Sequence, residues 1–174
     1  MISSPENPFL FTFDGVIPAL KNAHRADFGT PKEIANWYAM QAPRVLKQRA
    51  EQSHLDNVEG FAYCVFEYFY PGRLPKGDLD NCYTTVQELL QKPSASHVVK
   101  KHKGILSVVP NDKQVSTAHL VCHARPMIGA YLWIWADEED SVNHVQQLVL
   151  WKTFRETVLK NRLNKPTLPL LFRP

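Results

Sequence analysis

Runs of apolar residues along the chain alternate with segments in which apolar residues recur at helical spacing. A short run predicts a strand at 9–15, and the aromatic and β-branched run at 61–70 predicts a longer strand that is covered on both faces. Residues 104–109 (GILSVV) are typical of another strand. The alternation over 114–126 and the apolar run over 127–136 predict two more strands, which we expect to pair with each other as a hairpin.

Three segments have the pattern of amphipathic helices. The first, 30–52, opens with the Thr-Pro-Lys-Glu sequence of a capped helix start, and Pro43 is expected to kink or split it because proline removes a backbone donor. The second begins at Leu79. The third runs from the acidic cluster at 137–141 to the basic KNRLNK sequence, a distribution of charge that suits the helix dipole.

This order of elements predicts one α+β domain with a mixed, mostly antiparallel sheet flanked by helices. The length of 174 residues is enough for a single core. We expect residues 1–136 to form the body of the domain. Residues 137–174 would add a C-terminal helix and an extended, proline-rich tail packed on the same domain.

Composition and cysteine usage bear on where in the cell the protein is expected to act. The net charge is +3, and hydrophobic residues make up 44% of the chain, as in ordinary folded soluble proteins. No apolar run approaches the roughly 20 residues that span a bilayer, and the first residues lack the order of a secretion signal. The three cysteines, Cys64, Cys82 and Cys122, are an odd number without close pairing, which argues against a disulfide framework. We therefore expect a cytoplasmic protein.

Two aspartates, Asp78 and Asp80, stand where the second helix begins. In an extended segment, residues two apart point the same way with Cα atoms about 6.6 Å apart, so both carboxylates could converge on one cation. Asp80 would also lie near the exposed N–H groups of the first turn, where the helix dipole favours negative charge. The simpler interpretation is that one aspartate caps the helix and the other is a solvated turn residue.

The segments GDLDN at 77–81 and GILSVVPNDKQV at 104–115 together resemble the signature of the RusA family of Holliday-junction resolvases. In that family a D-x-D-N helix start is followed, after a helix and a loop, by a strand that ends in an acidic pair and Q-V or Q-I. The order of elements over residues 9–136 is also similar. The resemblance implies a RusA-like fold and a Mg²⁺-dependent endodeoxyribonuclease that resolves four-way DNA junctions by paired symmetric nicks.

Carried over by position, Asp78 and Asp80 match the two helix-start carboxylates, and Asp112 matches the second member of the later acidic pair. The resemblance implies that these three residues are catalytic and hold Mg²⁺, a hard ion that prefers oxygen ligands. The chain departs from the family at Asn111, which replaces the first member of the later pair. It also departs at Thr84, where the family usually carries a lysine.

The missing lysine leaves three alternatives open. The chemistry could be slow, another lysine such as Lys76 or Lys113 could substitute, or the chain could bind DNA without cutting it. The candidates for contact with the phosphate backbone are Arg73, Lys76, Lys100, Lys101, Lys103 and Lys113. Such contacts carry no information about base sequence.

Symmetric cleavage of a four-way junction calls for a two-fold homodimer, which the resemblance also implies. The strand at 127–136, with Tyr131, Trp133 and Trp135 on one face, is a candidate dimer surface, although such aromatic stripes more often belong to the core. The resemblance further suggests a phage or other mobile element as the source, with the protein acting at the nucleoid.

Other chemistries fit the sequence less well. His119 and His123 of the HLVCH sequence would stand about 13 Å apart on a strand, too far for one zinc ion, and are expected to form a polar face with Arg125 that meets DNA or solvent. Each cysteine lies in an apolar pattern that would leave its thiol inert. Two alternatives to the nuclease remain: a branched-DNA-binding protein of the same fold with little or no catalysis, and an unrelated α+β interaction domain.

Overall fold

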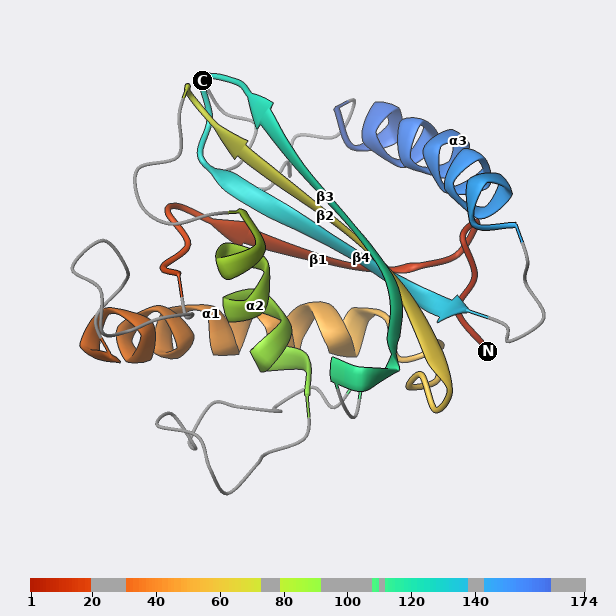
Figure 1. Cartoon of the computed structure of the whole chain (residues 1–174), viewed down its shortest axis with the longest axis horizontal. Coiled ribbons are helices and arrows are strands. Elements are labelled where there is room, and N and C mark those ends of the chain that lie inside the picture. Colours follow the sequence, from red (N-terminus) through yellow and green to blue (C-terminus); the bar gives the residue numbers. More distant parts are fainter. Residues whose placement is uncertain (20–30, 73–78, 92–107, 110–111, 138–142, 164–174) are drawn as a thin grey trace.

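A computed structural model of the chain describes residues 1–19, 31–72, 79–91, 108–109, 112–137 and 143–163. These residues form four strands, three α-helices and one short 3-10 turn (Figure 1). In chain order the elements are β1 (Phe9–Asp14), α1 (Pro31–Glu51), β2 (Phe61–Tyr70), α2 (Leu79–Leu90), the 3-10 turn η1 (Asp112–Gln114), β3 (Val115–Ala124), β4 (Gly129–Asp137) and α3 (His144–Leu163). Among the described helices, none is long and apolar enough to cross a membrane.

The four strands form one sheet in the order β1-β4-β2-β3 (Figure 1). β4 pairs antiparallel with β1 and β2, whereas β3 runs parallel to β2. The expected mixed, mostly antiparallel α+β sheet is therefore confirmed. The expected hairpin of β3 with β4 is wrong, because β2 lies between them. Eight of the nine residues of β4 are buried and none of β3 is, so the apolar strand takes an interior position and the more polar strand an edge.

Helices cover both faces of the sheet (Figure 1). On one face, side chains of α1 and α2 pack on Phe11, Phe66 and their neighbours. On the other face, Trp151 and other residues of α3 pack on Trp133 and Trp135. The prediction that 61–70 is covered on both faces is confirmed, since eight consecutive residues of β2 are buried.

Two expectations about the helices need correction. α1 is one continuous helix with Pro43 inside it, so the proline does not split it. Pro43 and Ala39 lie on the exposed side of α1, where water can serve the carbonyl that the proline leaves without a donor. α3 begins at His144 rather than in the acidic cluster: Asp137 belongs to β4, and the Asn143 side chain accepts a hydrogen bond from Gln146 N at 3.0 Å as a cap.

Some predictions lie partly or wholly outside the described residues. Of the expected strand 104–109, only Val108 and Val109 are described; both are buried and neither is in a strand. Residues 138–142 and the tail from 164 onward also lie outside the described part.

Candidate functional site

The amino end of α2 lies at the carboxyl end of β2. The Cys82 thiol points to the carbonyl of Ile17 at 3.6 Å, and the Thr85 hydroxyl donates to the carbonyl of Pro18. Ile17 in turn donates its N–H to the Tyr68 hydroxyl at 3.0 Å, near the end of β2. Asp80 lies in the first turn of α2 and is exposed, whereas Asp78 lies outside the described residues.

The carboxyl end of α2 lies at the opposite end of the sheet. The carbonyl of Leu90 accepts a hydrogen bond from Val109 N at 3.2 Å, and the carbonyl of Val108 accepts one from Val58 N at 2.9 Å. Gln114 then donates its side-chain amide to the carbonyls of Glu59 and Gly60 at 2.6 and 2.9 Å, just before β2 begins. Asp112, the first residue of η1, therefore lies near the start of β2.

The structure does not bring Asp112 to Asp80. Leu90 lies ten positions after Asp80 in the helix, a rise of about 15 Å at 1.5 Å per residue, and Asp112 follows the segment bonded to Leu90. The cause is topological: in a parallel β-α-β unit, the residues that enter the helix and those that enter the next strand lie at opposite ends of the sheet. Carboxylates at both ends cannot share one ion, since Mg²⁺ needs its oxygen ligands at about 2.1 Å.

No group of three or more His, Cys, Asp or Glu side chains that could hold a metal occurs within the described ranges. Asp78 lies outside those ranges. Two carboxylates are a sufficient protein contribution for Mg²⁺, which usually keeps several waters and completes its shell with substrate phosphate oxygens. The exposed position of Asp80 at a helix amino end suits such a ligand.

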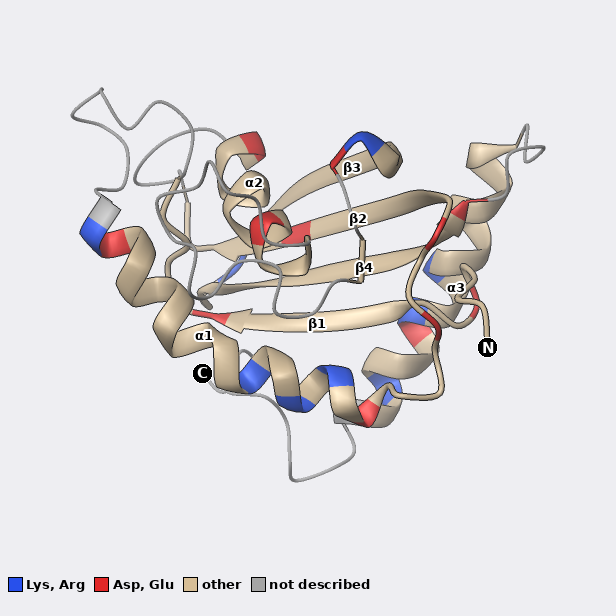
Figure 2. Cartoon of the chain, turned by 90° about the horizontal axis from the view of Figure 1, so that it is seen from below, with Lys and Arg blue, Asp and Glu red and all other residues tan. Residues whose placement is uncertain are grey.

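Thr84 stands one turn after Asp80, at the position of the family lysine. Its hydroxyl donates to the carbonyl of Asp80 at 2.8 Å, a bond within the helix that brings no charge to the site. α2 contains no Lys or Arg, and most of the described basic residues lie on α1 and α3 (Figure 2).

Only one of the predicted phosphate contacts is described. Lys113 lies in η1 beside Asp112, at the far end of α2 from Asp80, and is exposed. It is therefore not placed to replace the missing lysine in this structure. The remaining candidates, Arg73, Lys76, Lys100, Lys101 and Lys103, lie outside the described residues.

The aromatic residues of β4 belong to the core. Tyr131, Trp133 and Trp135 are fully buried, and Trp133 makes an edge contact with Trp151 of α3 at 5.8 Å between ring centroids. The suggestion that this stripe forms a dimer surface is wrong, because α3 already covers it. The alternative, that the stripe is core, is confirmed.

The sequence analysis missed a buried carboxylate beneath α3. Glu67 in the middle of β2 is 2% exposed and accepts hydrogen bonds from Trp133 Nε1 at 2.8 Å and Arg155 Nε at 2.9 Å. His123 Nε2 lies 2.9 Å from the other carboxylate oxygen. The available signal was a single acidic residue inside the apolar run FAYCVFEYFY. A buried charge needs such partners, so this cluster ties α3 to the sheet.

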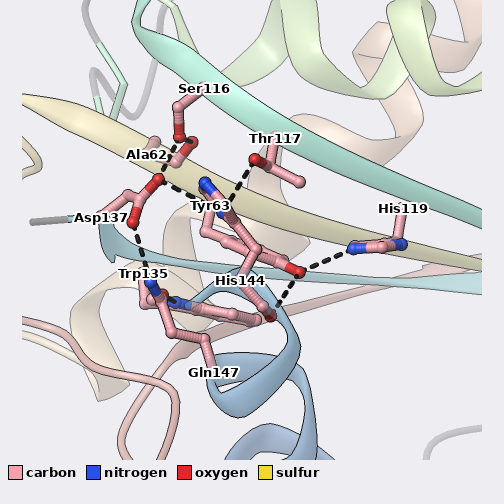
Figure 3. A network of polar contacts seen from close by, with 9 residues as sticks. All are labelled: Ala62, Tyr63, Ser116, Thr117, His119, Trp135, Asp137, His144 and Gln147. Carbon is pink, nitrogen blue, oxygen red and sulfur yellow. Dashed lines mark hydrogen bonds and ion pairs between the residues drawn. The ribbon is translucent and has the colours of Figure 1, made fainter. Parts of the chain in front are cut away.

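A second polar cluster joins the start of α3 to β2 and β3 (Figure 3). The Tyr63 hydroxyl lies 2.6 Å from His119 Nε2, and Asp137 accepts a bond from the Gln147 amide at 2.9 Å. Burial, together with the negative charge of Asp137, raises the pKa of Tyr63. His119 and His123 each lie against a partner on β2, so the expected polar face is largely used within the fold and offers no paired zinc ligands.

The cysteines agree in part with the prediction of inert thiols. All three are free, and burial raises the pKa of Cys64 to about 12. Cys82 is also buried, whereas Cys122 on β3 is exposed. Comparison with known proteins adds no assignment: no protein-family model matches the chain, and no curated protein matches it.

Proposed function

We propose that this chain is a Mg²⁺-dependent endodeoxyribonuclease that cuts four-way DNA junctions at the amino end of α2. The observation that carries the proposal is the D-x-D-N sequence at the start of that helix, with Asp80 exposed in the first turn. A phosphate group of DNA can approach an exposed helix amino end, where unpaired N–H groups favour anions.

Asp78 and Asp80 would hold the ion, and waters and phosphate oxygens would complete its shell. The bound ion would supply an acidified water and a Lewis acid for the phosphoryl oxygen. Asp112 is not part of this proposed site, which therefore has two carboxylates where the resemblance implies three. Basic residues of the flanking segments 73–76 and 100–103 are the proposed contacts with the DNA backbone, and a homodimer would present two such sites in the cytoplasm.

A second candidate is a protein that binds branched DNA and does not cut it. Two observations favour it: Asp112 lies at the far end of α2, and Thr84 supplies no positive charge beside Asp80. In this alternative Asp78 and Asp80 only stabilise the amino end of α2 and do not hold a catalytic metal ion.

The test is incubation of the wild type with a synthetic four-way junction, with and without Mg²⁺, beside Asp80→Asn and the matched control Asp112→Asn. We expect paired nicks that require Mg²⁺ and fall at least about 100-fold in Asp80→Asn, equivalent to about 2.7 kcal/mol at 1.36 kcal/mol per factor of ten. Asp112→Asn should cut within about threefold of wild type, because the same conversion makes that less than about 0.7 kcal/mol.

Each other result has a definite meaning. Junction binding without nicks supports the second candidate. Loss of cleavage in both variants contradicts the two-carboxylate site, and absence of any preference for junctions over linear duplex overturns both candidates. Thermal unfolding of each variant confirms that it is folded.

A further inference from the structure

The two edges of the sheet differ in whether their outward backbone N–H and C=O groups are hydrogen-bonded. At the β1 edge, the N–H and C=O of Leu10 bond to the Gln52 amide at 2.8 and 2.9 Å. Those of Thr12 bond to the Gln48 amide at 2.9 and 3.3 Å. Two glutamines one turn apart on α1 therefore satisfy the outward backbone groups of β1. This edge is closed to another strand.

The outward groups of the β3 edge can be identified from one bond. Arg125 N donates to the carbonyl of Tyr70 on β2 at 3.3 Å, so the backbone groups of Arg125 point toward β2. Successive residues of a strand point their N–H and C=O groups to alternate sides. The groups that point away from β2 are therefore those of Ala118, Leu120, Cys122 and Ala124.

No described residue forms a hydrogen bond with these four outward N–H and C=O pairs. β3 is ten residues long and contains no Asp, Glu, Lys, Arg or Pro. Val121 is 40% exposed and Cys122 is exposed. Sheet edges are normally protected by charge, proline, short length or a covering element, and among the described residues β3 has only the irregularity at its first residues.

We propose that β3 is the dimer interface, pairing antiparallel with β3 of a second copy so that two four-stranded sheets become one sheet of eight strands. A strand without charged residues can lie opposite itself without placing like charges together. Antiparallel pairing of identical strands also generates a two-fold axis, the symmetry of most homodimers. The choice of a second copy as partner rests on the proposed function, because paired symmetric nicks require two sites related by such an axis.

The pairing accounts for the contrast between the edges. In each copy α1 closes the β1 edge, which leaves only the β3 edge for pairing. Two copies can therefore form a dimer, and no further copy can add to the joined sheet. The buried face of β4 takes no part in it.

The test is the molar mass of the full chain in solution, without DNA and without Mg²⁺, measured by sedimentation over a range of concentrations. Wild type should approach twice the chain mass of 19.9 kDa. Cys122→Pro removes an outward N–H and leaves the ladder to β2 intact, so it should sediment as a monomer where wild type is a dimer. The matched control Cys122→Ser keeps that N–H and should remain dimeric.

Circular dichroism establishes whether Cys122→Pro is folded. Ala118→Lys provides a second test that leaves every backbone group in place, since a lysine on an edge opposes strand pairing, and it should also be monomeric. A wild type that stays monomeric at all concentrations, or folded edge variants that stay dimeric, would overturn the proposal. A dimer that does not cut junctions would contradict only the proposed nuclease activity. A monomer that cuts junctions would contradict only the proposed interface.

Discussion

The two ends of α2 differ in burial and in the bonds that hold them. At the carboxyl end, Leu89 and Leu90 are 1% exposed, Val109 N donates to the carbonyl of Leu90, and Val58 N, shortly before β2, donates to the carbonyl of Val108. At the amino end, Asp80 is exposed beside helix N–H groups.

This contrast assigns a structural role to one end of α2 and a proposed binding role to the other, whereas the sequence motif places residues from both ends in one site. The carboxyl end, with Asp112 nearby, positions the helix against the sheet. The amino end presents a carboxylate to solvent, where an ion and a phosphate group can reach it. The RusA-like resemblance assigns Asp80 and Asp112 to one site, whereas the fold places them near different ends of α2.

The largest expected effect on stability is at the buried end. Leu90→Ala should lower the free energy of unfolding by about 2–5 kcal/mol, because it removes apolar contacts and leaves a cavity. Urea unfolding measures this loss. Gln87→Ala, at a partly exposed position of the same helix, is the control and should change stability by less than about 0.5 kcal/mol. A loss below about 1 kcal/mol for Leu90→Ala would mean that this end is not anchored as described.

The amide of Gln114 should make a smaller contribution. Gln114→Ala removes its two bonds to the carbonyls of Glu59 and Gly60, with an expected loss of about 1 kcal/mol since the site is open to water. Gln114→Glu keeps the size of the side chain and replaces the donor with an acceptor. It should lose at least as much, and a neutral result for Gln114→Glu would contradict the role of the amide as a donor.

At the open end, Asp80→Asn should cost only about 0.3–1 kcal/mol of unfolding free energy, because Asp80 is exposed and a carboxylate in the first turn of a helix contributes on that scale. Salt screens such interactions, so the difference from wild type should shrink in 1 M salt, where the Debye length is about 3 Å. A loss that is large and independent of salt would indicate a buried structural role for Asp80 instead.

Asp112→Asn should have the smallest effect. Asp112 is exposed in η1, so unfolding by urea should differ from wild type by less than about 0.5 kcal/mol. A larger loss would show that Asp112 supports the turn into β3, which would still leave it outside the site at Asp80.

Local patterns predicted most elements but not their partners. The aromatic and β-branched content of 61–70 correctly predicted a strand covered on both faces. The strands at 115–124 and 129–137 were also predicted, yet adjacency along the chain suggested a hairpin, and nothing local encodes the insertion of β2 between them. The expected meeting of Asp112 with Asp80 is absent for the same reason, since the spacing of motifs does not determine at which end of a sheet a residue lies.

Buried polar groups were the other gap. Glu67 reads as one exception in an apolar run, and its partners Arg155 and His123 come from distant parts of the chain. Their meeting depends on how α3 packs on the sheet, which helical periodicity alone does not determine. For the candidate site, the sequence indicated Asp78 and Asp80, and the structure places Asp112 at the other end of α2 from Asp80.

The most direct test of this account is to locate the ion itself. Mn²⁺ can replace Mg²⁺ at oxygen ligands and broadens the NMR signals of nearby amides. On titration with Mn²⁺, the amide signals of Asn81 and Cys82 should disappear first, while those of Lys113 and Gln114 persist. Asp80→Asn should abolish the effect and Asp112→Asn should not. Equal broadening at both ends of α2 from one bound ion, or broadening confined to Lys113 and Gln114, would contradict the account.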